Sequence, residues 1–153
     1  LEEYILVLET NMTLLELKGP QQCLMNLVKD ILAFQRENFL AARFIYGESS
    51  LDSNLNREIH STYFTKEKSY FQYILEQGIK SRSFQQVSVP MYMLQLKGLL
   101  TAPVLHTHYA MDVLHVFPQE AYYTNIYANE VGRFLQDTLF IAEDLQPLLA
   151  GRG

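Results

Sequence analysis

The chain has 153 residues, enough for one folded domain that buries roughly two-thirds of the surface its unfolded form exposes. Hydrophobic residues make up 48% and charged residues 19%, with 10 Tyr and 9 Phe, so the composition excludes a disordered chain or a solvated coiled coil. Twelve basic and seventeen acidic residues give a net charge of −5, which excludes a surface that holds nucleic acid by neutralising phosphates.

Cysteine content and the start of the chain bear on where the protein works. The single cysteine, Cys23, leaves no partner for an intramolecular disulfide, and no apolar run approaches the roughly 18 residues of a membrane span. We therefore expect a cytoplasmic protein with no membrane partner. The opening letters LEEYILVLE contain neither an initiating Met nor a signal region, so we expect a fragment or a cleaved product.

Three helices are predicted in the first 50 residues. The first ends near Gly19 and carries a stripe of apolar residues at spacings of three and four: Leu1, Ile5, Leu8, Met12 and Leu15. The second begins at Pro20, ends at the polar QREN of residues 35–38, and carries a similar stripe: Leu24, Leu27, Val28, Ile31 and Phe34. The third is the short segment FLAARFIYGESS, residues 39–50.

Three longer helices are predicted in the rest of the chain. The fourth follows SSLDSNLN, which offers several N-caps, and runs to Gly78, which suits a C-cap. The fifth begins at Ser88 and Pro90 and runs into HTHYAM, residues 106–111. The sixth opens after Pro118 and Glu120 and continues to about Glu143. No segment alternates with a period of two, so we expect an all-α fold of about six helices.

The fifth and sixth helices are apolar on more than one side. In the fifth, Met91, Leu94 and Leu105 lie well away from the main apolar stripe, and the sixth has a broad stripe with Gly132 beside it, where a glycine would permit close helix approach. These apolar faces could be buried in two ways. Either the helices are core helices of the monomer, or a second copy covers them in a four-helix dimer seam.

The order of these parts resembles the C-terminal domain of the TetR/AcrR (tetracycline-repressor-like) transcriptional regulators. The likeness lies in NFLAARFIYGES, then a long helix, then YILEQGIKSRSFQQVSVPMYMLQLKGLL, where a helix ends in a glycine-containing turn and a hook with an aromatic leads into a Pro-started helix. It covers about residues 1–143. The resemblance implies an all-α homodimer paired through the last two helices, with this interface: Met93, Leu96, Leu100, Val104, Tyr123, Ile126, Tyr127, Val131, Phe134, Leu135 and Leu139.

Members of that family carry a helix-turn-helix domain before this part, and we expect this chain to depart from the family pattern by lacking it. We therefore expect residues 1–147 to be a ligand-binding and dimerisation domain, with 148–153 as a loose tail. The predicted function is that of the effector half of a repressor, which contacts operator DNA only through the absent domain. The alternative is a helical protein-interaction or scaffold module with no small-molecule ligand.

The resemblance also implies a binding cavity among the first, second, fourth and fifth helices, with the third nearby. An aromatic cavity of this kind suits a hydrophobic or planar effector. Arg43 and Glu48 are charges within the apolar third helix, but we expect both to face water or a neighbour. The predicted cavity residues are Leu8, Met12, Phe34, Phe44, Tyr63, Phe64, Tyr70, Phe71, Leu94 and Tyr109.

No catalytic or metal-binding pattern is present in the sequence, so we expect no enzyme and no cofactor. Cys23 lies on an apolar helical stripe with no base nearby in sequence, which is typical of a packed thiol. His106, His108 and His115 lack the i,i+4 spacing and the cysteine pair of a zinc site. The segment YGESS has a lone glycine and is no phosphate loop.

Overall fold

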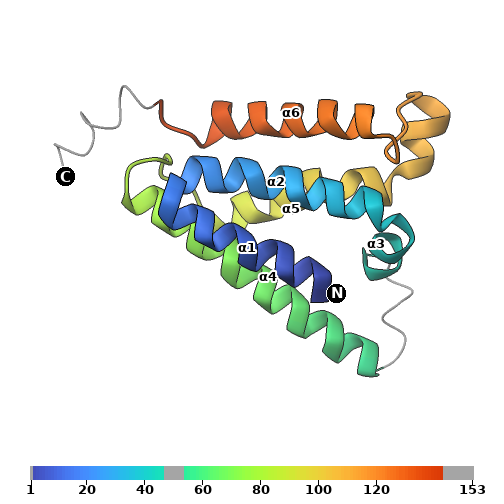
Figure 1. Cartoon of the computed structure of the whole chain (residues 1–153), viewed down its shortest axis with the longest axis horizontal. Helices are drawn as coiled ribbons and strands as arrows, with labels where there is room; N and C mark the ends of the chain where they lie inside the picture. Colours follow the sequence, from blue (N-terminus) through green and yellow to red (C-terminus); the bar gives the residue numbers. More distant parts are fainter. Residues whose placement is uncertain (1, 47–53, 143–153) are drawn as a thin grey trace.

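A computed structural model describes residues 2–46 and 54–142, and the fold of this part of the chain is all-α, as predicted (Figure 1). One isolated antiparallel bridge joins Phe84 and Phe140, and the described residues contain no strand. The helices are α1 (Glu2–Lys18), α2 (Pro20–Glu37), α3 (Phe39–Tyr46), α4 (Asn54–Lys80), α5 (Val89–Leu105), the π-helix η2 (Tyr109–Val113) and α6 (Ala121–Thr138).

Several helix boundaries lie where the sequence predicts them. Gly19 has a φ of 88°, a left-handed conformation that glycine adopts without strain, and Pro20 begins α2 directly after it. Asn38 is the C-cap of α2, where the polar QREN segment predicts a break. Ser88 is the N-cap of α5 and Pro90 lies in its first turn. The predicted third helix is described only to Tyr46, and its remaining residues, including Glu48, lie outside the described part of the chain.

Gly78 was predicted as a C-cap and instead lies inside α4, which ends at Lys80. The turn that follows is closed by the backbone N–H groups of Ser83 and Phe84, which both donate to the carbonyl of Gly78 at 2.9 Å. Arg82 takes the positive φ of this turn, 66°. The glycine is needed for another reason, because a Cβ at this position would lie 2.0 Å from the ring of Phe84.

The predicted end of the sixth helix at Glu143 is also wrong, since α6 ends at Thr138. The residues after it pair with the turn between α4 and α5. The backbone N–H of Gln85 donates to the carbonyl of Leu139 at 2.8 Å, and that of Ile141 donates to Ser83 at 2.9 Å. Gln21 adds hydrogen bonds to the carbonyls of Ser83 and Ile141, so extended pairing replaces the helix here.

The fifth helix does not continue into HTHYAM but ends at Leu105. Pro103 lies in its last turn and has no N–H to donate to the carbonyl of Leu99, four residues earlier. The hydroxyl of Tyr127, from α6, donates to that carbonyl instead. After His106 the chain forms the separate π-helix η2, a rare conformation that is often found at functional sites.

The central helix of the bundle is α2, which packs against α1, α3, α4, α5 and α6. In Figure 1, α1 and α4 lie side by side below it and α6 runs above it. Gly132 of α6 faces α2, where the methyl of Met25 lies 2.6 Å from the position a Cβ would take, so the close approach predicted for this glycine is made within the chain. Among the described residues no helix is long and apolar enough to cross a membrane.

The hydrophobic core lies along α2 and receives side chains from four other helices and the turn after α4. Its largest fully buried members are Leu8, Leu24, Leu27, Ile31, Ile74, Leu75, Phe84, Leu96, Leu135 and Leu139. Cys23 is in this core and its thiol donates to the carbonyl of Asn11 at 3.1 Å, which confirms the prediction of a packed thiol. Burial raises the pKa of the Cys23 thiol from 9.0 to about 11.

Candidate functional site

A cavity of about 600 Å³, the main cavity, lies among α1, α2, α4 and α5, with the end of α3 at its edge. These are the helices among which the family resemblance implies a binding cavity. Its lining is mostly apolar and aromatic: Tyr4, Ile31, Gln35, Tyr46, Phe64, Glu67, Lys68, Phe71, Gln72, Glu76, Val89, Pro90, Met93, Leu94, Leu96, Lys97, Leu100 and Thr101.

An ion pair between Glu67 of α4 and Lys97 of α5 lies in the main cavity. The ammonium group of Lys97 donates to both carboxylate oxygens of Glu67, at 2.8 Å to Oε1 and 3.0 Å to Oε2. The hydroxyl of Tyr4, from α1, donates to the same Oε1. The Glu67 side chain is only 12% exposed, so three helices meet at a carboxylate that is largely withdrawn from water.

Aromatic rings flank the ammonium group of this pair. Lys97 Nζ lies 4.8 Å from the ring centroid of Tyr46 and 5.1 Å from that of Phe64, distances at which a cation is attracted to a ring face. Burial, and then the negative charge of Glu67, raise the pKa values of Tyr4 and Tyr46 above their ordinary value. Both phenols therefore stay neutral at physiological pH and serve as hydrogen-bonding and ring surfaces.

The buried amide of Gln35 lies in the wall shared by the main cavity and a second one. Its Nε2 donates to the hydroxyl of Tyr46 at 3.3 Å. Its Oε1 is buried, with the whole residue only 2% exposed, and no residue within 2–46 or 54–142 donates a hydrogen bond to it. A buried acceptor without a donor costs free energy, so this oxygen marks a place where a bound molecule could supply one.

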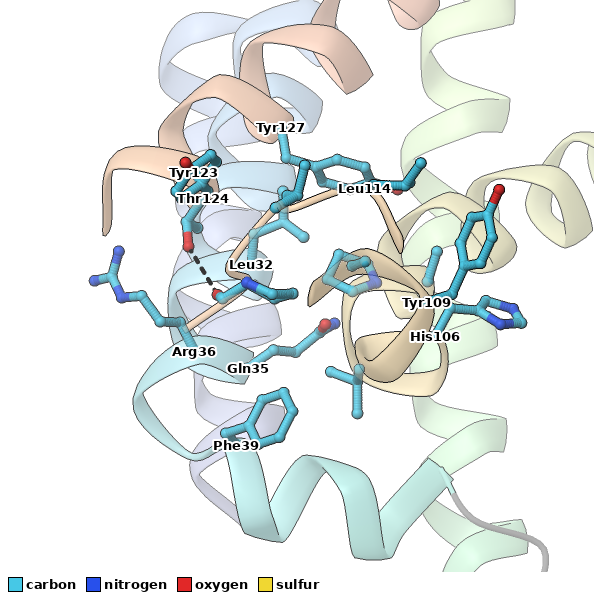
Figure 2. A pocket seen from close by; sticks show the side chains of 16 residues that line it. Leu32, Gln35, Arg36, Phe39, His106, Tyr109, Leu114, Tyr123, Thr124 and Tyr127 are labelled. Atoms are coloured by element: carbon cyan, nitrogen blue, oxygen red, sulfur yellow. Dashed lines mark hydrogen bonds between the residues drawn. The ribbon is translucent and has the colours of Figure 1, made fainter. Parts of the chain in front are cut away.

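The second cavity, of about 510 Å³, lies between α2, α6, the end of α5 and η2 (Figure 2). In Figure 2, Leu32 and Gln35 project into it from α2, Tyr123 and Tyr127 from α6, and Tyr109 stands at its edge. Its full lining is Leu32, Gln35, Arg36, Phe39, Ala102, Pro103, Val104, His106, Tyr109, Ala110, Leu114, Val116, Pro118, Tyr123, Thr124 and Tyr127.

The ten residues predicted to line a cavity are dispersed. Phe64, Phe71 and Leu94 line the main cavity, and Tyr109 lines the second. Phe34 and Tyr63, with Phe64, border a gap of about 10 Å³, which is too small for a ligand.

The other four predicted cavity residues line neither cavity. Leu8 is fully buried in the core and Met12 packs against it, because their face of α1 is turned toward the neighbouring helices. Phe44 is 61% exposed, and the hydroxyl of Tyr70 donates to Glu9 at 3.3 Å.

Most residues of the predicted dimer interface are covered by the chain itself. Six are buried in the monomer: Leu96, Leu100, Val104, Val131, Leu135 and Leu139. Phe134 stacks on Tyr92, Met93 lines the main cavity, and Tyr123 and Tyr127 line the second. Ile126 remains 43% exposed. The apolar side chains that α5 and α6 leave open to a partner are therefore chiefly others: Met91, Leu94, Leu105 and Tyr122.

Sequence reasoning missed the polar residues of the main cavity, and a signal for two of them was present. Glu67 lies on the apolar stripe of α4, four residues after Tyr63 and four before Phe71, and Lys97 is the one charged residue between positions 89 and 105. Gln35 and Tyr46 carry no such signal, because they stand at helix ends. Arg43, which was weighed as a ligand contact, is exposed as expected.

The histidines weighed as metal ligands lie on the surface. His106, His108 and His115 are all exposed, and His106 stands at the rim of the second cavity. Across residues 2–46 and 54–142, no group of three or more His, Cys, Asp or Glu side chains is placed to hold a metal ion.

Comparison with known proteins relates the chain to a regulator. It is 41% identical over 130 residues to a Bacillus subtilis (strain 168) protein described as "Probable HTH-type transcriptional regulator YttP". The aligned region covers 85% of this chain and 63% of the relative, so the chain spans less than two-thirds of the relative's length. No model of a known protein family matches the chain. The chain is therefore a homologue of a probable HTH-type transcriptional regulator, a description that names a regulator and no enzyme.

Proposed function

We propose that the chain is the effector-binding and dimerisation part of a ligand-responsive transcriptional repressor of the TetR type. Homology to a probable HTH-type transcriptional regulator supports the regulatory role. The main cavity, at about 600 Å³, supports the ligand-binding role, since small-molecule sites are commonly apolar clefts of this size with a few polar groups. The observation that carries the proposal is the hydrogen bond from Tyr4 of α1 to Glu67 inside this cavity.

The effector fits the chemistry of the cavity lining. Phe64, Phe71 and Leu94 favour a largely apolar, aromatic molecule. The Glu67–Lys97 pair favours a polar end that hydrogen-bonds to one of its members, because an apolar group laid over the pair would remove the water that still reaches Lys97, whose side chain is 33% exposed. An aromatic amine would compete for Glu67, and a phenol or a carboxylate would compete for Lys97.

The coupling to DNA would act through α1. In the TetR-like arrangement that we propose, the DNA-binding domain precedes this helix. A ligand that displaces Tyr4 from Glu67 changes what holds the N-terminal turn of α1 against α4 and α5. The effector needs only to favour one position of α1 over the other for DNA to be released, because coupling depends on differential contact with two states.

The ligand-binding half of the proposal is tested by a thermal-shift screen of aromatic amines, phenols and carboxylates. A compound at 100 times its Kd should raise the midpoint by about 5–10 °C for a domain of this size. Lys97→Met and Phe64→Ala should each reduce that shift, whereas Lys29→Met, which removes an exposed lysine from α2, should not. Hits that keep their full shift in both cavity variants would contradict the proposed site.

The regulatory half is tested in cells that carry the intact gene. Transcripts that change when such a hit is added should stop responding when the gene encodes Lys97→Met, and should keep responding with Lys29→Met. Transcript levels that change neither when the hit is added nor when the gene is deleted would contradict a role in transcription. This outcome is independent of whether the hit binds the main cavity.

A further inference from the structure

The second cavity has the features of a ligand site in its own right. It holds about 510 Å³ and shares with the main cavity only the side chain of Gln35. The charged pair of the main cavity is not part of it. Its walls come from α2, the N-terminal half of α6 and the segment from Ala102 to Pro118.

Two hydroxyl groups on the α6 side of this cavity, those of Tyr127 and Thr124, already make hydrogen bonds. The Tyr127 hydroxyl donates to the carbonyl of Leu99, which the proline at 103 leaves without its usual helical donor. The Thr124 hydroxyl lies 3.1 Å from the carbonyl of Glu120 and 3.3 Å from that of Pro118. These side chains therefore present apolar and aromatic surface to the interior.

Gln35 is the exception in this lining. Its Nε2 donates to the hydroxyl of Tyr46, and in the described part of the chain no group donates a hydrogen bond to its buried Oε1. Figure 2 shows the side chain reaching from α2 toward the α5 side of the cavity. A bound molecule with an N–H or O–H group would satisfy an acceptor that is otherwise left unpaired at a cost.

The rim of the cavity is built from η2 and the residues beside it. Tyr109 is 57% exposed and Leu114 is 53% exposed, so large apolar side chains stand in water at the entrance. A π-helix is rare and is frequently found at functional sites. Here three residues separate it from the end of α5, and it places Tyr109 and Ala110 on the lining.

From these observations we propose that the second cavity binds a flat, uncharged, largely aromatic molecule that donates one N–H or O–H group to Oε1 of Gln35. The volume and the aromatic walls fit two or three fused rings, and the unpaired acceptor specifies the donor. This site is additional to the effector site proposed above, because it lacks the ion pair and its lining shares only Gln35 with the main cavity.

The location is tested by titrating the whole chain with 2-naphthol while following the methyl groups of Ala, Leu and Met by NMR. Ring-current shifts are expected at Ala102 and Ala110, which line the second cavity alone. Saturable shifts confined to Met93 and Leu94, which line the main cavity alone, would overturn the proposal, as would the absence of saturable binding. Neither result depends on the main cavity being an effector site.

The donor is tested with a matched pair of probes. Gln35→Met removes the acceptor at similar volume and should weaken 2-naphthol binding about tenfold, the loss of one buried hydrogen bond, while leaving 2-methoxynaphthalene unchanged. Equal weakening of both probes would contradict the assigned hydrogen bond. Ala110→Phe, which fills the cavity from its rim, should abolish the binding of both. If Gln35→Met does not fold, Ala110→Phe tests the location, and weaker binding of 2-methoxynaphthalene than of 2-naphthol to the wild-type chain tests the donor.

Discussion

The ring of Phe84 occupies the space that a side chain on Gly78 would need. A Cβ on Gly78 would lie 2.0 Å from Cδ2 of Phe84, and Phe84 is itself almost fully buried. On its other side the ring stacks on Phe140 with centroids 5.3 Å apart and planes 3° from parallel. The end of α4 and the segment after α6 are thus joined through one aromatic ring.

Gly78→Ala should therefore destabilise the fold by about 1–3 kcal/mol, because a buried ring has no room to shift away from the added methyl group. Gly98→Ala is the matched control, since Gly98 is exposed on α5 and an added Cβ meets nothing within 4 Å. It should stabilise by about 0.5–1 kcal/mol through helix propensity. Urea denaturation measures both values, and equal effects of the two substitutions would contradict the packing described.

The Glu67–Lys97 pair should show a measurable coupling energy. Glu67→Gln and Lys97→Met should each cost about 1–3 kcal/mol of stability, since each leaves a largely buried partner with lost hydrogen bonds. The double variant should cost less than the sum of the two, with a coupling of about 1–2 kcal/mol. The exposed pair of Glu130 and Arg133, with oxygen and nitrogen 3.6 Å apart, is the control and should couple by less than about 0.5 kcal/mol.

Stability should fall at high pH through Cys23. The thiol ionises near its ordinary pKa of 9.0 in the unfolded chain but near about 11 in the fold, so between these values only the unfolded state releases the proton. The free energy of unfolding then decreases as pH rises from 9 and stops decreasing from this source above 11. The total is at most about 2–3 kcal/mol.

Cys23→Ala isolates this effect, because tyrosine titration acts on both proteins and cancels in their difference. The difference in unfolding free energy between the wild-type chain and Cys23→Ala, measured in urea, should shrink between pH 8 and pH 11. A difference that stays constant across this range would show that the buried thiol does not control the decline.

Dimerisation, if it uses α5 and α6 as proposed, should depend on Ile126 and not on Leu17. Ile126 of α6 is 43% exposed and Leu17 of α1 is 74% exposed, so a glutamate is tolerated at either place in the monomer. Sedimentation at tens of micromolar should give a dimer for the wild-type chain and Leu17→Glu, and a monomer for Ile126→Glu. A wild-type chain that sediments as a monomer would remove the dimer from the proposed function.

The helical fold was predictable because apolar spacing and the Gly, Pro and Ser boundary residues agree along most of the chain. The failures have tertiary causes. The local sequence favours an end of α4 at Gly78 and a continuation of α6 beyond Thr138. The ends of both helices are set instead by Phe84 and Phe140, which come together from distant parts of the chain. At the end of α5, Pro103 is a signal visible in the sequence, because a proline inside a helix removes a backbone hydrogen bond and favours an end nearby.

The site was harder to predict than the fold, because an aromatic residue at helical spacing suits a core and a cavity equally well. Leu8 and Phe71 share this pattern, yet only Phe71 lines the main cavity. The two charges on apolar stripes, Glu67 and Lys97, were the better signal, since a buried charge needs a partner. Gln35 could not be singled out from sequence, because its importance lies in one unpaired oxygen.

The pairing of Phe84 with Phe140 closes a loop of chain that contains α5, η2 and α6 (Figure 1). Gln21 holds both ends of this loop through the carbonyls of Ser83 and Ile141. The part of each cavity lined by α5 lies within the loop, and the rim at η2 lies far along the chain from its closure. We therefore expect local fluctuations to open the second cavity at its η2 rim while the loop stays closed. We expect the amide hydrogens of Gln85 and Ile141 to exchange with solvent only through global unfolding, and those near Tyr109 to exchange much faster.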